Sequence, residues 1–159
     1  MITQNDVVAA VKAAILETYP GETVYVNLVP SRFVRPSFLV ETTDFSVTAS
    51  TCGSVTLRST VHVVCFENVD EYHNSQLESL NVRQMAVIGL FAPMFLPVGD
   101  RAPDVVKLSG SAGGRDWTDV TAVLEWDEDL NEFRSIRELP NMEDITLRLE
   151  ETTNGNAKH

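Results

Sequence analysis

The sequence predicts a single α+β domain in which two helices flank a mainly antiparallel sheet. Two segments carry apolar residues at helical spacing, and four alternating segments fall into pairs joined by short turns that contain glycine. Hydrophobic residues make up 43% of the 159 residues and charged residues 22%, as in globular domains that fold around one core. The expected order is helix, strand, hairpin, helix, hairpin, strand.

The first helix is predicted from Thr3 to about Tyr19. Thr3 and Asp6 have the spacing of a capping box, and apolar residues then recur at helical spacing at Val7, Val8, Val11 and Ile15. Pro20-Gly21 ends the helix, because proline cannot continue the hydrogen-bond ladder and glycine adopts the left-handed conformation easily. A short strand, 23–29, is expected next.

The first hairpin joins strands 38–49 and 54–66 through Thr51-Cys52-Gly53. In its second arm one face is apolar and the other polar. The apolar row is Val55, Leu57, Val61, Val63 and Cys65, and the polar row is Thr56, Arg58, Thr60 and His62. One face therefore belongs to the core, and the other meets water or a partner.

The second helix is predicted from Ser75 to about Leu90, because Ser75 and Glu78 fit a capping box. Its helical row is Leu77, Leu80, Gln84, Val87, Ile88 and Phe91. A second hairpin joins 104–109 and 116–126, with the inward row Val120, Ala122, Leu124 and Trp126. Alternation over 145–149 predicts a last strand, so that residues 1–151 form the domain and 152–159 a flexible tail.

Charge and targeting features narrow the range of functions. Twelve Lys and Arg stand against 23 Asp and Glu, and the resulting net charge of -11 opposes binding to DNA backbones and anionic membranes. The start of the chain lacks a secretory signal, and the apolar run 85–98 is too short to span a bilayer. We expect a protein made in the cytoplasm, with Cys52 and Cys65 as free thiols.

The strongest metal-like pattern lies in an acidic segment after Trp126. It has the oxygen-bearing residues of a calcium loop at positions 1, 3, 5, 9 and 12, namely Asp127, Asp129, Asn131, Ser135 and Glu138. The sixth position, however, is Glu132 instead of glycine, and the residues before the segment read as a strand. We interpret the segment as a solvated acidic turn and predict no metal.

No arrangement of residues predicts catalysis or a cofactor. His62 and Cys65 are three apart in a strand and so face opposite ways, which does not suit zinc. Cys65, Asp70 and His73 supply residue types used in nucleophilic catalysis, but no local signature arranges them. The glycine-rich loop 110–114 lacks the Gly-Lys-Ser/Thr ending of a phosphate-binding loop. We therefore predict a structural protein and not an enzyme.

Two loops carry residues suited to a protein interface. In the segment 30–36 an aromatic residue stands between two of the few cations, and the segment 91–103 is crowded with apolar residues. The candidate interface residues are Arg32, Phe33, Arg35, Phe91, Met94, Phe95 and Leu96. The alternatives are plain loop packing for the first loop and a core position for the second.

Three stretches resemble the tail terminator family of long-tailed bacteriophages and prophages. They are Met1-Ile2-Thr3-Gln4-Asn5-Asp6, Val24-Tyr25-Val26-Asn27 and Phe33-Val34-Arg35-Pro36-Ser37-Phe38-Leu39-Val40-Glu41. The resemblance is best over about the first 70 residues and weak beyond Arg101.

The resemblance implies a small structural virion protein at the junction of tail and head. Members assemble into a hexameric ring on the tail tube, stop its polymerisation and present a surface to head-completion proteins. An acidic ring would let DNA pass through its channel without specific binding, and we place the loop 32–35 against acidic residues of a neighbouring subunit. The alternatives are a head-to-tail joining subunit, or a small cytoplasmic enzyme or ligand-binding domain.

Overall fold

The computed structural model describes residues 1–135, and their elements confirm the α+β fold class. In chain order they are α1 (Gln4–Thr18), β1 (Thr23–Val26), β2 (Ser37–Thr51), β3 (Ser54–Phe66), α2 (Leu77–Leu90), β4 (Asp104–Ser111), β5 (Trp117–Asp129) and α3 (Leu130–Ser135). The predicted last strand, 145–149, the domain end at 151 and the tail lie outside the described residues.

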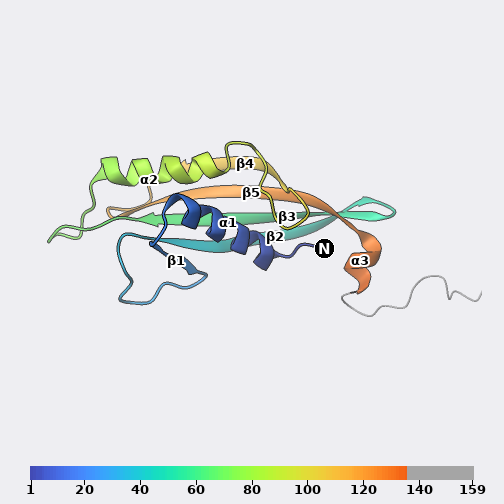
Figure 1. Cartoon of the computed structure of the whole chain (residues 1–159). Coiled ribbons are helices and arrows are strands. Elements are labelled where there is room, and N and C mark those ends of the chain that lie inside the picture. The colour runs from blue at the N-terminus through green and yellow to red at the C-terminus, as the bar shows by residue number, and fades with distance from the viewer. Residues whose placement is uncertain (136–159) are drawn as a thin grey trace, which may run out of the picture.

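The five strands form one sheet in the order β1-β2-β3-β5-β4. All neighbouring pairs are antiparallel except β1 and β2, which are parallel. α1 packs on β1 and β2, α2 packs on β3, β4 and β5, and the two helices touch each other, so both cover the same face (Figure 1). The core lies between these two layers, and the opposite face of the sheet has no helix over it among residues 1–135.

α1 begins as the sequence predicts. The Thr3 hydroxyl accepts a hydrogen bond from the Asp6 amide at 3.3 Å, and the Asp6 carboxylate accepts one from the Thr3 amide at 2.7 Å. The predicted apolar row is buried against the sheet. The helix ends at Thr18, and the chain turns at Gly21, whose φ of 86° favours glycine.

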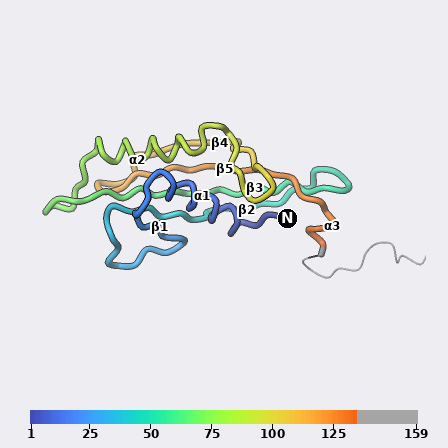
Figure 2. The backbone as a smooth tube through the Cα atoms, in the orientation of Figure 1, coloured from blue at the N-terminus to red at the C-terminus, as the bar shows by residue number. Residues whose placement is uncertain are grey.

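The hairpin of β2 and β3 is the longest part of the sheet and matches the predicted segments closely. Val55, Leu57, Val61, Val63 and Cys65 are all buried, which confirms the predicted inward face of β3. Figure 2 shows β1 at one end of the sheet and the hairpin running on past α1 to the other end. β1 itself is shorter than predicted, because Asn27 takes a φ of 63° and turns the chain away.

The predicted capping box of α2 is wrong. The helix begins at Leu77 after Gln76, which makes no side-chain cap. Ser75 is used elsewhere: its amide donates to the Arg115 carbonyl at 3.1 Å, and its hydroxyl donates to the Glu67 carbonyl at 3.4 Å. Ser75 therefore ties the start of α2 to the ends of β3 and β5 instead of capping the helix.

The second hairpin is longer than predicted and leads into a helix that the sequence analysis did not predict. Val120, Ala122, Leu124 and Trp126 are buried, which confirms the inward row of β5. α3 begins directly after β5, where the Asp129 carboxylate accepts a hydrogen bond from the Asn131 amide at 2.6 Å.

Cys52, at the hairpin turn, and Cys65, in β3, are free thiols as expected. None of the helices in 1–135 combines the length and apolar character needed to cross a bilayer.

Candidate functional site

The loop between β1 and β2 folds back onto the sheet face that the helices leave uncovered. Phe33 packs against Tyr25 and Phe66, with ring centroids 6.4 Å and 4.6 Å apart. The Tyr25 hydroxyl accepts a hydrogen bond from the Val34 amide at 3.0 Å. Phe33 is half-buried by these contacts, so its place is that of a packing residue within its own subunit.

Arg35 is held inside its own subunit. Its guanidinium lies over the rings of Phe33 and Phe66, 4.5 Å and 5.5 Å from their centroids. The same group donates to the Glu67 carbonyl at 3.0 Å and forms an ion pair with the Asp116 carboxylate. The expectation that Arg35 faces acidic residues of a neighbour is therefore corrected, because its charge already has an acidic partner.

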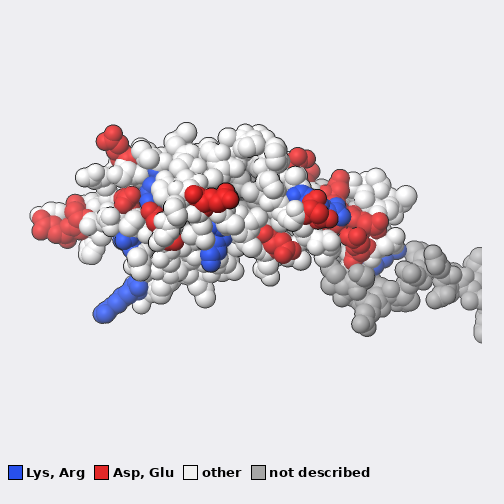
Figure 3. Space-filling view, viewed as in Figure 1, with Lys and Arg blue, Asp and Glu red and all other residues white. Residues whose placement is uncertain are grey.

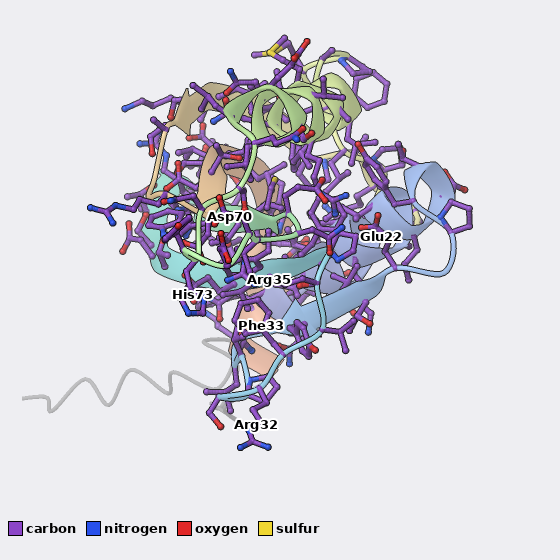
Figure 4. The ribbon with its side chains drawn as sticks, turned by 90° about the vertical axis from the view of Figure 1, so that its left-hand side faces the viewer. Glu22, Arg32, Phe33, Arg35, Asp70 and His73 are labelled. Atoms are coloured by element: carbon purple, nitrogen blue, oxygen red, sulfur yellow. The ribbon has the colours of Figure 1, made fainter. Side chains whose placement is uncertain are left out.

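Arg32 differs from the other two candidates of this loop. It is exposed at the tip of the loop and points away from the ribbon, whereas Phe33 and Arg35 point back toward it (Figure 4). Among residues 1–135 it forms no ion pair or hydrogen bond. Arg32 is therefore the candidate of this loop that is available to a partner.

Exposed apolar residues lie in β1 and in the same loop as Arg32. Leu28 is 80% exposed, and Val26 and Val34 are also exposed. We name Val26, Leu28, Arg32 and Val34 the β1-side patch. Its apolar residues belong to β1 and the loop after it, and none of them is part of the core cluster of residues 1–135. A cation amid apolar side chains is a composition suited to the edge of a protein interface.

The segment after α2 contains both core and surface residues. Phe91 and Leu96 are 1% and 4% exposed, so the expectation that they form an interface is wrong. The chain turns at the end of α2 and lays these two side chains into the core. Met94 and Phe95 remain exposed, on the turn where the Met94 carbonyl accepts from the Val105 amide at 2.9 Å.

The outward side of α2 forms a second apolar surface, which the sequence analysis missed. Leu77, Val82 and Met85 are exposed, Val82 by 62%, and with Glu78 and Asn81 they line a shallow hollow of about 530 Å³. We name these five residues the α2 patch. Leu77 belongs to the predicted helical row but is 61% exposed, whereas Leu80 and Val87 of the same row are buried. The signal that could have found this surface is that Val82 and Met85 are apolar but fall outside the predicted helical row.

The two patches lie on different borders of the molecule, the β1-side patch beside β1 and the α2 patch on the helix over β4 and β5 (Figure 1). Figure 3 shows acidic side chains at both ends and in the middle of one face, with a largely uncharged area along its upper border. This distribution leaves room for apolar contacts on an otherwise acidic protein.

A polar connection, 67–76, lies at the same end of the molecule as the loop of Arg32. The Asp70 carboxylate accepts hydrogen bonds from the amides of Tyr72 and Asn74 at 2.8 Å and 2.9 Å, and His73 is exposed with a φ of 58° (Figure 4). The connection borders a polar hollow of about 470 Å³. The Asp70 carboxylate therefore stabilises the turn of its own loop through these two hydrogen bonds.

Cys65 lies where a thiol cannot act as a nucleophile. It points into the core, while His62 points to the opposite face, as the strand spacing predicts. Burial raises the pKa of the Cys65 thiol to about 12. The thiolate is the reactive form, so at neutral pH this group is inert.

His62 forms a polar cluster across three strands on the uncovered face, which the sequence analysis did not identify. Its ring nitrogens lie 3.1 Å from Glu41 of β2 and 2.8 Å from Asp119 of β5. Burial lowers the pKa of His62, but the hydrogen bonds with Asp119 and Glu41 outweigh burial, and the pKa is raised. Burial raises the pKa of Asp119, but hydrogen bonds from Ser111 and His62 outweigh it, and the pKa is lowered.

Arg83 is a buried cation that joins the helices to the sheet. It is 5% exposed, forms an ion pair with Glu22, and lies over the rings of Phe38 and Tyr19, 4.3 Å and 4.9 Å from their centroids. Burial lowers the pKa of Arg83, but its hydrogen bond with Glu22 outweighs burial, so the pKa is raised. These contacts give Arg83 a place in the packing of the domain.

The acidic segment after Trp126 is a strand end followed by a helix. Asp127 and Asp129 belong to β5, Asn131 and Ser135 belong to α3, and Glu138 lies outside the described residues. No group of three or more His, Cys, Asp or Glu side chains within residues 1–135 is arranged to hold a metal ion.

Comparison with known proteins does not assign a family. No family model and no curated protein matches the chain. Among the 26 matching chains of solved structures, one has a TM-score of 0.43 at 15% identity, covering 81% of this chain and 96% of its own. A similarity at this level carries no argument about function.

Proposed function

We propose that the protein is a ring-forming structural subunit of a phage tail, a tail terminator that closes the tail tube and offers a surface to head-completion proteins. One observation carries the proposal: the chain has two unlike apolar patches on different borders of one domain, the β1-side patch and the α2 patch. A cyclic ring of identical subunits requires two such unlike surfaces, because each contact joins one surface to the other.

The two patches suit each other in chemistry. Leu28 and Val34 on one patch match Leu77, Val82 and Met85 on the other, so their contact removes apolar surface from water. Arg32 on the first patch has the opposite charge to Glu78 on the second, which is exposed beside the apolar residues, so the two can form an ion pair between subunits. A charge pair at the rim fixes register and speeds encounter more than it adds affinity.

The uncovered face of the sheet suits the wall of a channel. It carries five carboxylates, Glu41, Asp44, Asp119, Glu125 and Asp127, beside the cation Arg58 and the imidazole of His62, in a chain whose net charge is -11. Negative charge does not bind a DNA backbone, so DNA would slide past such a wall without adhering. The resemblance to tail terminators, which is best over about the first 70 residues, agrees with this reading.

A mixing experiment tests the head-to-tail contact. Light scattering at rising concentration should show association for the wild type and a monomer for Leu28→Asp and for Val82→Asp. An equimolar mixture of these two variants should stop at a dimer, because only one intact pair of patches remains. Val106→Asp, which changes an exposed valine outside both patches, is the matched control and should associate like the wild type.

Association of Leu28→Asp and Val82→Asp at wild-type strength would contradict the proposed contact. Binding of the assembled protein to connector proteins but not to tail tubes would favour a head-to-tail joining subunit instead.

A further inference from the structure

β2 is much longer than the strand that protects its outer edge. β1 pairs only with Ser37–Val40, and the chain leaves the edge at Asn27, which donates its amide to the Val40 carbonyl at 3.0 Å. Within residues 1–135 no strand pairs with that edge from Glu41 to Thr51. An open edge of this length presents amides and carbonyls to an extended segment.

The pairing within the sheet determines which backbone groups of β2 point to the open side. Opposite residues of an antiparallel pair alternate between bonding each other and both pointing away. The Val40 carbonyl points outward to Asn27, so Val40 and its partner Val63 both point away from each other. The register of β3 with β5 is continuous, so every second residue of β3 from Val63 to Val55 points to β5. Beyond the irregularity at 42–44, their partners on β2 therefore point to the open edge. These partners are Phe45, Val47 and Ala49.

Two of these residues also expose apolar side chains on the helix side of the sheet. Phe45 and Val47 are 38% and 39% exposed, although their partners Ser59 and Leu57 are buried in the core. The Phe45 ring contacts the buried ring of Trp126, with centroids 6.4 Å apart. A hollow of about 490 Å³ lies at the edge, between the first turn of α1 and residues 41–45. An added strand therefore has space beside the edge and apolar side chains to pack on.

The charged residues of β2 are both acidic. The strand carries Glu41 and Asp44 but no Lys or Arg. Glu41 lies 3.1 Å from His62, whereas Asp44 is exposed and forms no ion pair within residues 1–135. Asp44 is opposite Thr60, on the row that faces away from the helices. A segment that complements this edge has apolar residues on one row and a Lys or Arg on the other.

We infer that the open edge of β2 binds an extended, basic segment of another protein, which adds a strand to the sheet. Backbone hydrogen bonds to Phe45, Val47 and Ala49 supply the affinity, and alternate side chains of the segment supply the specificity. The apolar side chains of the segment pack on Phe45 and Val47, and its Lys or Arg lies beside Asp44.

A second copy of β2 fits this edge less well than a basic segment does. Two β2 strands paired with each other bring no cation to Asp44, because neither contains a Lys or Arg. The inference does not rest on the proposed function, since the edge lies beyond the end of β1 and shares no residue with the β1-side patch or the α2 patch.

Peptide binding to the full chain tests the inference. The probe is an end-blocked peptide in which valine alternates with threonine and lysine, and the control is a scrambled peptide of the same composition. In NMR titrations the alternating peptide should bind at least about ten-fold more tightly than the scrambled one. The amides of Phe45 and Val47 should then exchange at least about ten-fold more slowly than in the free chain. The amides of Val61 and Val63, inside the sheet, report that the domain stays folded.

Alternate N-methylation of the peptide separates strand addition from adhesion of a cation to an acidic surface. A strand offers only every second amide to a given neighbour. Methylation of one alternate set of peptide amides should therefore abolish binding, whereas methylation of the other set should leave it intact. Equal tolerance of both sets would overturn the inference.

Variants of the chain locate the site. Val47→Asp should weaken binding of the alternating peptide about ten-fold, although the added charge attracts lysine. Val106→Asp is the matched control, because Val106 is an exposed valine of β4, and it should bind like the wild type. Asp44→Lys should reverse the charge preference, so that a peptide with glutamate in place of lysine binds better.

Three results would contradict strand addition at this edge. They are equal binding of the alternating and scrambled peptides, equal effects of Val47→Asp and Val106→Asp, and slow exchange of the Phe45 and Val47 amides in the free chain. The last result would mean that the edge is already occupied without a partner.

Discussion

Arg35 forms an ion pair with Asp116, although the two residues are 81 positions apart in the chain. The pair joins the loop after β1 to the residue just before β5, and the Arg35 guanidinium also covers Phe33 and Phe66. Arg35, which the sequence predicted to face a neighbouring subunit, therefore stabilises its own domain. It also shapes the loop that presents Arg32.

Arg35→Gln should lower the free energy of unfolding by about 2 kcal/mol, the usual effect of losing a hydrogen bond to a charged group. Both side chains are partly covered, at 19% and 29% exposure, so solvent screens the pair only in part. Urea denaturation measures the change. Arg32→Gln is the matched control and should shift stability by less than about 0.5 kcal/mol. Equal stability of the two variants would show that the Arg35–Asp116 ion pair does not stabilise the loop.

Glu22→Gln should destabilise the domain by about 3 kcal/mol, because it leaves the charge of Arg83 buried without its closest partner. The double change Glu22→Gln with Arg83→Met should cost less than the sum of the two single changes, since the buried charge, which in Glu22→Gln keeps only Glu67 at 3.8 Å, is then gone. A double-mutant cycle from urea midpoints measures this coupling. Additive effects would mean that the two residues do not act as a pair.

The His62 cluster should make stability depend on pH in a defined direction. The folded pKa of His62 is raised, so its contribution is complete below the unfolded value of about 6.5 and is lost as pH rises through the folded pKa. The folded pKa of Asp119 is lowered, so its contribution is present above about 3.9 and is lost as pH falls through its folded pKa. The cluster therefore stabilises most between about pH 4 and 6.5.

Urea midpoints from pH 5.5 to 8.5 measure the His62 part of this dependence. His62→Gln should flatten the decline of stability above about pH 6.5. His73→Gln is the matched control, because His73 is exposed in a loop, and it should keep the wild-type profile. A His62→Gln profile that falls as steeply as the wild type would contradict the assignment.

Arg32→Glu should weaken association between subunits about ten-fold while leaving the unfolding midpoint unchanged, because a rim charge sets register more than fold. Combining Arg32→Glu with Glu78→Arg should restore association, since the pair is exchanged. Sedimentation at several concentrations measures both effects. If the charge exchange fails to restore association while Arg32→Glu impairs it, the partner of Arg32 is not Glu78.

The sequence predicts the parts of this fold that are encoded locally. Thr3 and Asp6 mark the start of α1, and alternation along Val55–Cys65 identifies the inward face of β3, because both signals lie within a few residues. Ser75 carries the same capping signal but bonds to Glu67 and Arg115, which only the assembled domain brings near. Propensity is overridden there by tertiary contacts.

The candidate site is harder to predict, because its partners are distant in sequence. Glu22 and Arg83 are 61 residues apart, and His62 meets Asp119 across 57. Phe91 and Met94 look alike as apolar loop residues, yet one is buried and the other exposed, depending on how the chain turns after α2. Composition shows that a loop is apolar but not which side chains face the core.

The proposed function is tested most directly by mixing the purified chain with growing tail tubes and measuring tube lengths by negative-stain electron microscopy. We expect a ring at one end of each tube and an arrest of growth, both lost in Leu28→Asp and Val82→Asp but kept in Val106→Asp. Tubes that grow to the same length with and without the wild-type chain, and carry no ring, would contradict it.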